Sequence, residues 1–192
     1  HKAVHADFIP ADRHKEQSAD RLPDLPASGV DTRANRDGKP MWVHNQRNSW
    51  HGVEFPYHSE LDIREYRRDY NRSLSAVDES LGVILTWLDA QGLSKNTIVI
   101  LMGDNGFMFG EHGLIDKRNA YEESMRVPLI MYAPSKIAAG LKIDEVVANL
   151  DIAPTLLDWA GLVVPDHYEG RSMTALIDQT EGQAWRDTLF YE

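Results

Sequence analysis

The residues most suited to chemistry are Asp104 and Asn105, which directly follow the apolar run 97–102. That run is bounded by polar residues and predicts a buried strand. In open α/β sheets ligands bind at the carboxyl ends of strands, so both side chains stand where a site is expected. A carboxylate and an amide oxygen suit a hard cation such as Ca²⁺ or Mg²⁺. On spacing alone, a simple Asp-Asn-Gly turn that leaves a strand is an equal alternative.

Further motifs follow in the same part of the chain. Gly-Glu-His-Gly occupies 110–113, Lys-x-x-x-Tyr-Glu begins at Lys117, and Arg-Val-Pro-Leu-Ile occupies 126–130. Asn-Leu-Asp-Ile-Ala-Pro-Thr-Leu-Leu fills 149–157. Together with Gly-Asp-Asn-Gly at 103–106, this series resembles the sulfatase family of the alkaline-phosphatase-like superfamily. The resemblance covers nearly the whole chain and corresponds to the later part of a sulfatase catalytic domain.

The resemblance implies an α/β fold with a mostly parallel sheet flanked by helices, alkaline-phosphatase-like and present as a fragment. We expect residues 1–165 to be the C-terminal portion of the catalytic α/β domain, and residues 166–192 to begin a C-terminal subdomain. Sulfatases carry an early Asp pair that binds metal, and a (Cys/Ser)-x-Pro-Ser-Arg motif that matures to a formylglycine nucleophile. This chain has no Cys, and its Pro134-Ser135 is followed by Lys136. The nucleophile and the other metal ligands are therefore expected in a missing N-terminal region.

The resemblance also implies roles for individual residues. Asp104 and Asn105 match metal ligands, which usually bind Ca²⁺, with Mg²⁺ as the second choice. Lys117 matches a catalytic lysine that contacts the sulfate, and a compact ammonium with three donors suits the oxygens of an anion. Taken alone, a solvated loop lysine is the default interpretation of such a residue. Arg126 is expected to pair with a neighbouring glutamate, Glu122 or Glu123.

Two histidines complete the predicted site. His5 matches a family histidine that donates to the substrate or leaving-group oxygen, although Asp7 stands where the family commonly has Pro. A nearby carboxylate favours the charged imidazolium. His112 is predicted to bind substrate, because sugar-directed sulfatases often carry Glu-His at this place. Holding the loop by a hydrogen bond is the equal alternative for His112. The polar and aromatic mixture at 45–51 suits sugar recognition or a packed surface loop.

Composition limits the partners. The chain has 192 residues, a hydrophobic fraction of 42% and a net charge of -10. This charge argues against nucleic acid as a partner, which would require a basic face. No run of 18 apolar residues is present, so no membrane span is expected. A periplasmic or extracellular location follows from the family resemblance alone.

The surrounding elements are predicted from periodicity and breaker residues. A helix at 62–91 should end at Gly92 and pack on the sheet through one apolar face. A second helix is expected at 151–160, with Asp151 as its N-cap and Gly161 as its end. The stretch 11–60 is either a functional loop or a surface excursion, and 1–10 should hold the end of a strand. Besides 97–102, strands are expected at 127–132, 143–147 and 188–191. The helix positions expected to face the sheet are Leu74, Val77, Leu81, Ile84 and Leu88.

The sequence thus predicts a sulfuric ester hydrolase that acts on a small-molecule or glycan sulfate ester, most naturally a sulfated carbohydrate. The 192 residues alone are expected to be inactive, because the nucleophile lies outside them. One alternative is a phosphodiesterase or phosphonate monoester hydrolase of the same superfamily, in which an Asp-His metal pattern is common. The other is a non-catalytic fragment that binds an anion.

Overall fold

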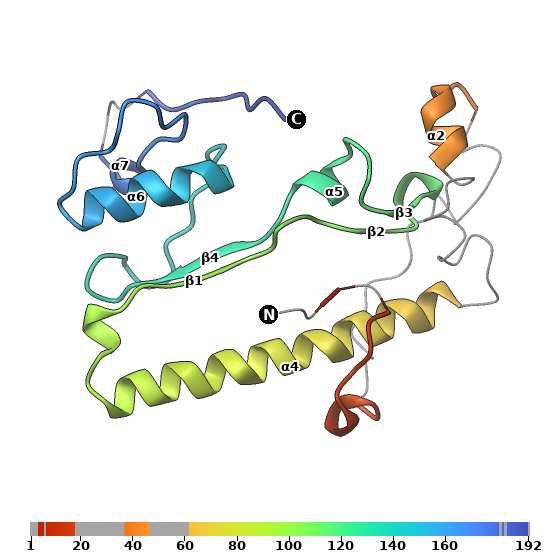
Figure 1. Ribbon diagram of the computed structural model, residues 1–192, viewed down its shortest axis with the longest axis horizontal. Coiled ribbons are helices and arrows are strands. Elements are labelled where there is room, and N and C mark those ends of the chain that lie inside the picture. The colour runs from red at the N-terminus through yellow and green to blue at the C-terminus, as the bar shows by residue number, and fades with distance from the viewer. Residues whose placement is uncertain are drawn as a thin grey trace. The chain divides into compact units, whose positions relative to one another are not determined.

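The structure is a computed structural model that describes residues 4–5, 7–17, 37–46, 62–180, 182 and 184–191. These residues form two compact units, one drawn from 1–93 and 100–130, the other from 94–99 and 131–192. Figure 1 shows the order of the elements. The helices are η1 (Asp12–His14), α2 (Met41–Gln46), α4 (Ile63–Ala90), η2 (Ser94–Asn96), η3 (Glu111–Gly113), α5 (Glu122–Met125), η4 (Asn149–Asp151), α6 (Ile152–Trp159) and α7 (Thr174–Ile177). The strands are β1 (Val99–Met102), β2 (Met108–Phe109), β3 (Ile115–Asp116) and β4 (Leu129–Tyr132).

The long helix α4 is confirmed, together with the signals that bound it. Asp62 caps its start, because its carboxylate accepts the backbone N–H of Arg64 at 2.8 Å. Gly92 follows its end with φ 68°, and the N–H of Leu93 returns to the carbonyl of Leu88 at 2.9 Å. This is the glycine-terminated Schellman arrangement, which satisfies carbonyls that the helix end leaves without partners.

The predicted apolar face of α4 is only partly buried. Leu88 is buried, and Val77 and Leu81 are half-buried, but Leu74 is 41% exposed and Ile84 is 51% exposed. The assignment of Leu74 and Ile84 to a core face is therefore wrong for the described residues. Periodicity indicates which side of a helix is apolar, but it does not specify how much of that side a given chain covers.

The described strands form two hydrogen-bonded pairs, β1 with β4 and β2 with β3. The β2–β3 pair is antiparallel, with Met108 opposite Asp116. The N–H of Gly103, just after β1, donates to the carbonyl of Pro128, just before β4, at 3.4 Å. The end of β1 thus meets the start of β4, so this pair also runs antiparallel. The parallel neighbours expected for β1 do not occur in these two pairs.

Two of the predicted strands are shorter in the structure, and others do not form among the described residues. The strands expected at 97–102 and 127–132 are present as β1 and β4, each shortened at its start. Residues 143–147 and 188–191 form no strand, and neither do the described residues among 1–10. In the first of these stretches the backbone carbonyl of Val146 accepts the indole N–H of Trp185 at 2.8 Å. That carbonyl is therefore satisfied by a side chain rather than by a strand ladder.

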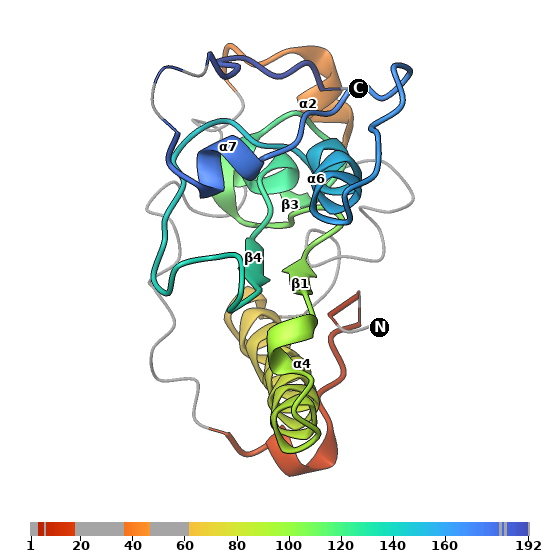
Figure 2. The same cartoon turned by 90° about the vertical axis from the view of Figure 1, so that its left-hand side faces the viewer.

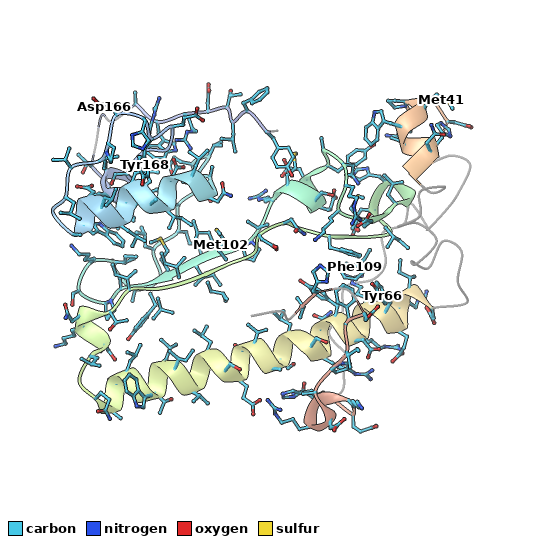
Figure 3. The ribbon with its side chains drawn as sticks, viewed as in Figure 1. Met41, Tyr66, Met102, Phe109, Asp166 and Tyr168 are labelled. Atoms are coloured by element: carbon cyan, nitrogen blue, oxygen red, sulfur yellow. The ribbon has the colours of Figure 1, made fainter. Side chains whose placement is uncertain are left out.

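The N-terminal segment docks on α4 in the first unit. Phe8 is buried among aromatic rings, with centroids 4.6 Å from Tyr66 and 5.1 Å from Tyr70. It also meets Phe109 at 5.8 Å, and Figure 3 shows Tyr66 of α4 lying near Phe109 of β2. Burial, helped by nearby carboxylates, raises the pKa of Tyr66, so its hydroxyl stays neutral. This aromatic cluster fixes the β2–β3 hairpin against the helix.

Helix α6 in the second unit matches the predicted range, but the predicted N-cap role of the Asp151 side chain is not observed. Gly161 ends the helix with φ 70°. Asp151 occupies the N-cap position, but its side chain makes no cap hydrogen bond. Its carboxylate is fully buried and accepts the N–H groups of Ala148 and Arg171, each at 2.8 Å, and both Nη atoms of Arg186 at 2.6 and 2.7 Å. Figure 2 shows α6 and α7 side by side.

Candidate functional site

Asp104 and Asn105 lie in the bend that follows β1, as the sequence predicted. The carboxylate of Asp104 accepts the backbone N–H of Asn105 at 2.9 Å. The amide nitrogen of Asn105 donates to the carbonyl of Gly106 at 2.8 Å, so the side chain is held in one orientation. Asp104 is exposed and Asn105 is half-buried. Both side chains therefore keep oxygen lone pairs that can accept further partners.

Lys117 comes to this bend from the segment after β3. Its ammonium donates to Oδ1 of Asn105 at 2.9 Å. The side-chain oxygen of Asn105 is thus already directed at a positive charge. The arrangement unites the predicted sulfate-binding lysine with one of the two predicted metal ligands. No ion pair joins Lys117 to Asp104 among the described residues.

Gly106 explains why the bend can approach α5 so closely. Its N–H donates to the carbonyl of Ser124 at 2.8 Å. A Cβ at this position would lie 2.0 Å from the carbonyl oxygen of Glu123, a distance that no side chain tolerates. Glycine has no Cβ and therefore permits this close backbone approach. The sequence does not identify α5 as the element approached, because that contact is tertiary.

His112 holds its loop against α5. Its ring stacks on Tyr121 with centroids 3.9 Å apart and planes 11° apart. Its Nε2 lies 3.2 Å from Oε2 of Glu123, a distance suited to N–H donation to the carboxylate. The residue has φ 56°, the left-handed region that is strained for a side chain. Of the two roles predicted for His112, loop attachment is present in this geometry. Substrate binding remains a prediction.

Other carboxylates also support the loop. Glu111 accepts the backbone N–H of Phe109 at 2.6 Å, which closes the turn between β2 and η3. Arg126 pairs with Glu122 at 3.9 Å, as expected, and both side chains are largely exposed. This pair is worth little, because solvent screens exposed charges. Glu111 and Glu123 were missed as loop supports, although each flanks a motif residue in sequence.

His5 is not joined to the Asn105–Lys117 pair. His5 is exposed, and its backbone carbonyl accepts the N–H of Phe8 at 3.3 Å. Within the described residues no hydrogen bond or ion pair links the His5 side chain to Asn105 or Lys117. Asp7 has φ 76°, so the chain turns sharply where the family commonly has Pro. The catalytic role of His5 stays a prediction.

The aromatic stack continues onto α2. The Trp42 ring lies 6.4 Å from the Tyr121 ring, and the ammonium of Lys39 lies 5.8 Å from the centroid of Tyr121. Val43 is buried with Met108 and Leu114, which attaches α2 to the β2–β3 hairpin. Trp42 itself remains 49% exposed. Of the stretch 45–51 predicted for sugar recognition, Asn45 and Gln46 end α2, and residues 47–51 lie outside the described residues.

Comparison with known proteins gives the context of this geometry. The family model described as N-sulphoglucosamine sulphohydrolase, C-terminal, matches residues 110–192. An N-acetylglucosamine-6-O-sulfatase from Bacteroides thetaiotaomicron is 41% identical over 131 residues, which cover 67% of this chain and 23% of that protein. The chain belongs to the sulfatase family. It corresponds to a later part of the sulfatase domain and spans about a quarter of the length of the curated relatives it matches.

Solved structures confirm the fold class. BT4656, in complex with its substrate D-glucosamine-2-N,6-O-disulfate, is 27% identical with a TM-score of 0.71 and covers 97% of this chain and 48% of its own. The phosphonate monoester hydrolase from Silicibacter pomeroyi has a TM-score of 0.81 at 23% identity, with 95% of this chain and 37% of its own covered. The fold is therefore α/β and alkaline-phosphatase-like, present in part. The domain division at 165 and 166 stays a prediction.

Proposed function

We propose that the full-length protein is a sulfuric ester hydrolase and that this chain supplies part of its sulfate and metal site. The observation that carries the proposal is the contact between Lys117 and Asn105 at the end of β1. In this chain of the sulfatase family, the Lys117 ammonium and the Asn105 amide oxygen meet at the end of β1. A sulfate ester needs such charge, because its non-bridging oxygens repel a nucleophile.

Asp104 and Asn105 fit a divalent cation by the chemistry of their donors. Both offer hard oxygen atoms, and Asn105 Oδ1 already faces a positive group. Within the described residues no group of three or more His, Asp or Glu side chains gathers as a metal site. Since Ca²⁺ takes six to eight oxygens, the rest of the shell must come from elsewhere. We infer Ca²⁺, with Mg²⁺ as the alternative. A bound cation would neutralise charge on the sulfate oxygens.

The chain's own residues act on the anion. Lys117 donates to a sulfate oxygen whose charge changes during transfer, while Asn105 keeps the ammonium in place from the other side. His5 is assigned to the leaving-group oxygen by family resemblance. The nucleophile, a formylglycine derived from Cys or Ser, is assigned to the part of the protein outside these 192 residues. The 192-residue chain by itself is therefore expected to show no turnover.

A sulfated carbohydrate is the favoured substrate class. The exposed Trp42 ring and the Lys39 ammonium lie beside Tyr121, on which His112 stacks, and they give an apolar face beside a positive charge. Sugar rings stack on aromatic faces of this kind, and the lysine suits a second anionic group. This arrangement supports the role of His112 at the substrate. An exported location, periplasmic or extracellular, belongs to the same proposal. None of the helices in the described part has the length and apolarity to cross a membrane.

A phosphonate monoester hydrolase is the second candidate. The fold similarity to such an enzyme is high, with a TM-score of 0.81. Asn105 favours the sulfatase, because an Asp-His metal pattern is common among phosphonate and phosphodiester hydrolases of the superfamily. A non-catalytic anion-binding role is the third possibility and predicts binding of inorganic sulfate without turnover.

The test uses the full-length protein. It is assayed with an aryl sulfate, a 6-O-sulfated glucosamine, a phenyl phosphonate monoester and a phosphodiester, each with and without prior chelator treatment. We expect the fastest turnover on a sulfate ester, loss of activity after chelation and recovery with Ca²⁺. Faster turnover of the phosphonate or phosphodiester would move the protein to the second candidate. Sulfate binding with no turnover of any ester would favour the third.

The sugar assignment has its own variant. Trp42→Ala should raise KM for the sulfated glucosamine and leave KM for a small alkyl sulfate unchanged, because the alkyl group offers no ring to stack on the indole. Met41→Ala is the matched control, since Met41 is the exposed neighbour on the same helix. Equal effects of both substitutions on both substrates would contradict sugar recognition by this surface.

A further inference from the structure

Asp116 is a charged residue in an unfavourable place. It is 4% exposed, and its φ of 102° lies in the region that glycine adopts readily and other residues avoid. It pairs across the hairpin with Met108, which is fully buried, so the backbone has little room to relax. Strained backbone of this kind persists where the surrounding structure enforces it, and it is frequent at functional sites.

The Asp116 carboxylate has one strong partner. Its Oδ2 accepts from the guanidinium of Arg118, whereas Oδ1 is buried with no hydrogen-bond partner among the described residues. A buried carboxylate oxygen without a partner is unfavourable, because it loses its hydration and gains nothing in return. The pair is thus a poor way to stabilise a hairpin, which argues for another reason to keep it.

The pair brackets Lys117. Asp116 and Arg118 are the residues on either side of it, so their ion pair closes a short ring of backbone around Lys117. Because Asp116 is fixed in the hairpin, that ring limits the directions in which the Lys117 side chain can leave the backbone. The ammonium is found at 2.9 Å from Asn105 Oδ1. Lysine has a flexible stem, so a restraint at its base determines how often its head occupies the site.

We propose that Asp116 is a positioning residue for Lys117 and acts through its ion pair with Arg118. This inference rests on the proposed function, because it concerns the lysine assigned to the sulfate. Asp116 does not touch the substrate in this scheme. It reduces the conformational freedom of Lys117 before substrate arrives, so that the ammonium is in place when charge develops on the sulfate oxygen.

The experiment is a double-mutant cycle in the full-length enzyme with an aryl sulfate. Asp116→Asn keeps the size of the side chain and a residue type that tolerates positive φ, but it removes the charge. We expect it to lower kcat by about 10- to 100-fold, with KM changed by less than about threefold, because misplacement of a catalytic group lowers the rate. Arg118→Ala should give the same loss, and the variant with both substitutions should be no worse than either.

The decisive comparison is made in the Lys117→Ala background. If Asp116 acts through Lys117, Asp116→Asn should have no further effect there, within about twofold. A purely structural role would instead lower activity by the same factor in both backgrounds, which would overturn the inference. Melting temperatures of all variants check that the fold is retained. If Asp116→Asn does not fold, Arg118→Ala in the two backgrounds gives the same test through an exposed partner.

The two proposals fail in different ways. A full-length protein that hydrolyses no sulfate ester would contradict the proposed function before any variant is made. An active protein in which Asp116→Asn leaves kcat unchanged, or acts additively with Lys117→Ala, would contradict the positioning role alone.

Discussion

The ammonium of Lys117 lies 2.9 Å from Oδ1 of Asn105, and the two residues are twelve positions apart in the chain. Between them the chain forms the β2–β3 hairpin, which turns back so that the segment after β3 returns to the end of β1. The ring of Phe8 packs against Phe109 of the hairpin, and Met108 and Ile115 of the hairpin are themselves buried. The contact is therefore a property of the hairpin rather than of either residue alone.

Replacement of Lys117 should impair catalysis more than substrate binding. In the full-length protein, Lys117→Ala should lower kcat for an aryl sulfate by about 10²–10³-fold, because one charge-stabilising donor is lost. Lys117→Arg should recover little, since the guanidinium is larger and planar and cannot reproduce a point contact at Asn105. Lys142→Ala, an exposed lysine of the other unit, is the control and should retain full activity. Steady-state kinetics measure all three, and wild-type kcat in Lys117→Ala would remove the lysine from the mechanism.

Gly106→Ala should disrupt the site by a steric route. The new Cβ would lie 2.0 Å from the backbone carbonyl oxygen of Glu123, so the bend and α5 must separate. Overpacking of this kind costs about 1–3 kcal/mol or more. Gly82→Ala is a sharp control, because Gly82 lies within α4 and a Cβ there meets nothing within 4 Å. That substitution should stabilise by about 0.5–1 kcal/mol. The melting temperature should therefore fall for Gly106→Ala and rise for Gly82→Ala, whereas aryl sulfate turnover should fall for Gly106→Ala alone.

Local signals predicted the elements of this chain well. The apolar period, the Asp62 cap and Gly92 define α4 within a residue at each end, because each acts over a few positions. The family resemblance likewise predicts that Asp104, Asn105 and Lys117 belong to one site. The structure adds the contact between two of them.

Tertiary contacts were not predictable from the same signals. Asp151 precedes α6 in a pattern typical of an N-cap, yet its carboxylate accepts the N–H groups of Ala148 and Arg171 and binds Arg186, 35 residues away. A hydrogen bond between two charged groups is stronger than one between neutral groups, and no local pattern reports where the guanidinium will come from. The exposure of Leu74 and Ile84 has a related cause, since an apolar stripe predicts burial without naming what buries it.

The Asp151–Arg186 pair should dominate the stability of the second unit. Asp151 is fully buried and the Arg186 side chain is 12% exposed, so removing one partner leaves the other charged and desolvated. Asp151→Ala should lower the free energy of unfolding by about 3–5 kcal/mol. Asp187→Ala, which removes an exposed hydrogen bond from Thr188 in the same unit, should cost no more than about 0.5 kcal/mol. Urea denaturation followed by tryptophan fluorescence compares the two variants, and similar costs would contradict the importance of burial.

The last prediction concerns the docking of η1 on α4 as pH falls. The guanidinium of Arg13 and the ring of His14 donate to the Glu79 carboxylate, which holds the pKa of Glu79 below its ordinary value of 4.5. A carboxylate with a lowered folded-state pKa contributes stability that is present above the unfolded-state pKa. That contribution is lost as pH falls through the folded-state value. The attachment of η1 should therefore be intact at neutral pH and weaken as the pH falls below 4.5, the ordinary pKa of a Glu side chain.

Amide hydrogen exchange, corrected for the intrinsic rate at each pH, measures this attachment at His14 and Gln17, whose N–H groups bond to the carbonyls of Ala11 and His14. Protection should fall over this acidic range in the unsubstituted protein. In Glu79→Gln it should be lower at neutral pH and nearly independent of pH over the same range, because the titrating partner is gone. The pKa of Asp12 is also lowered, by Lys15, so Asp12→Asn is the companion control. If Asp12→Asn abolishes the pH dependence and Glu79→Gln does not, the helical turn itself titrates and the contact with α4 does not govern its docking.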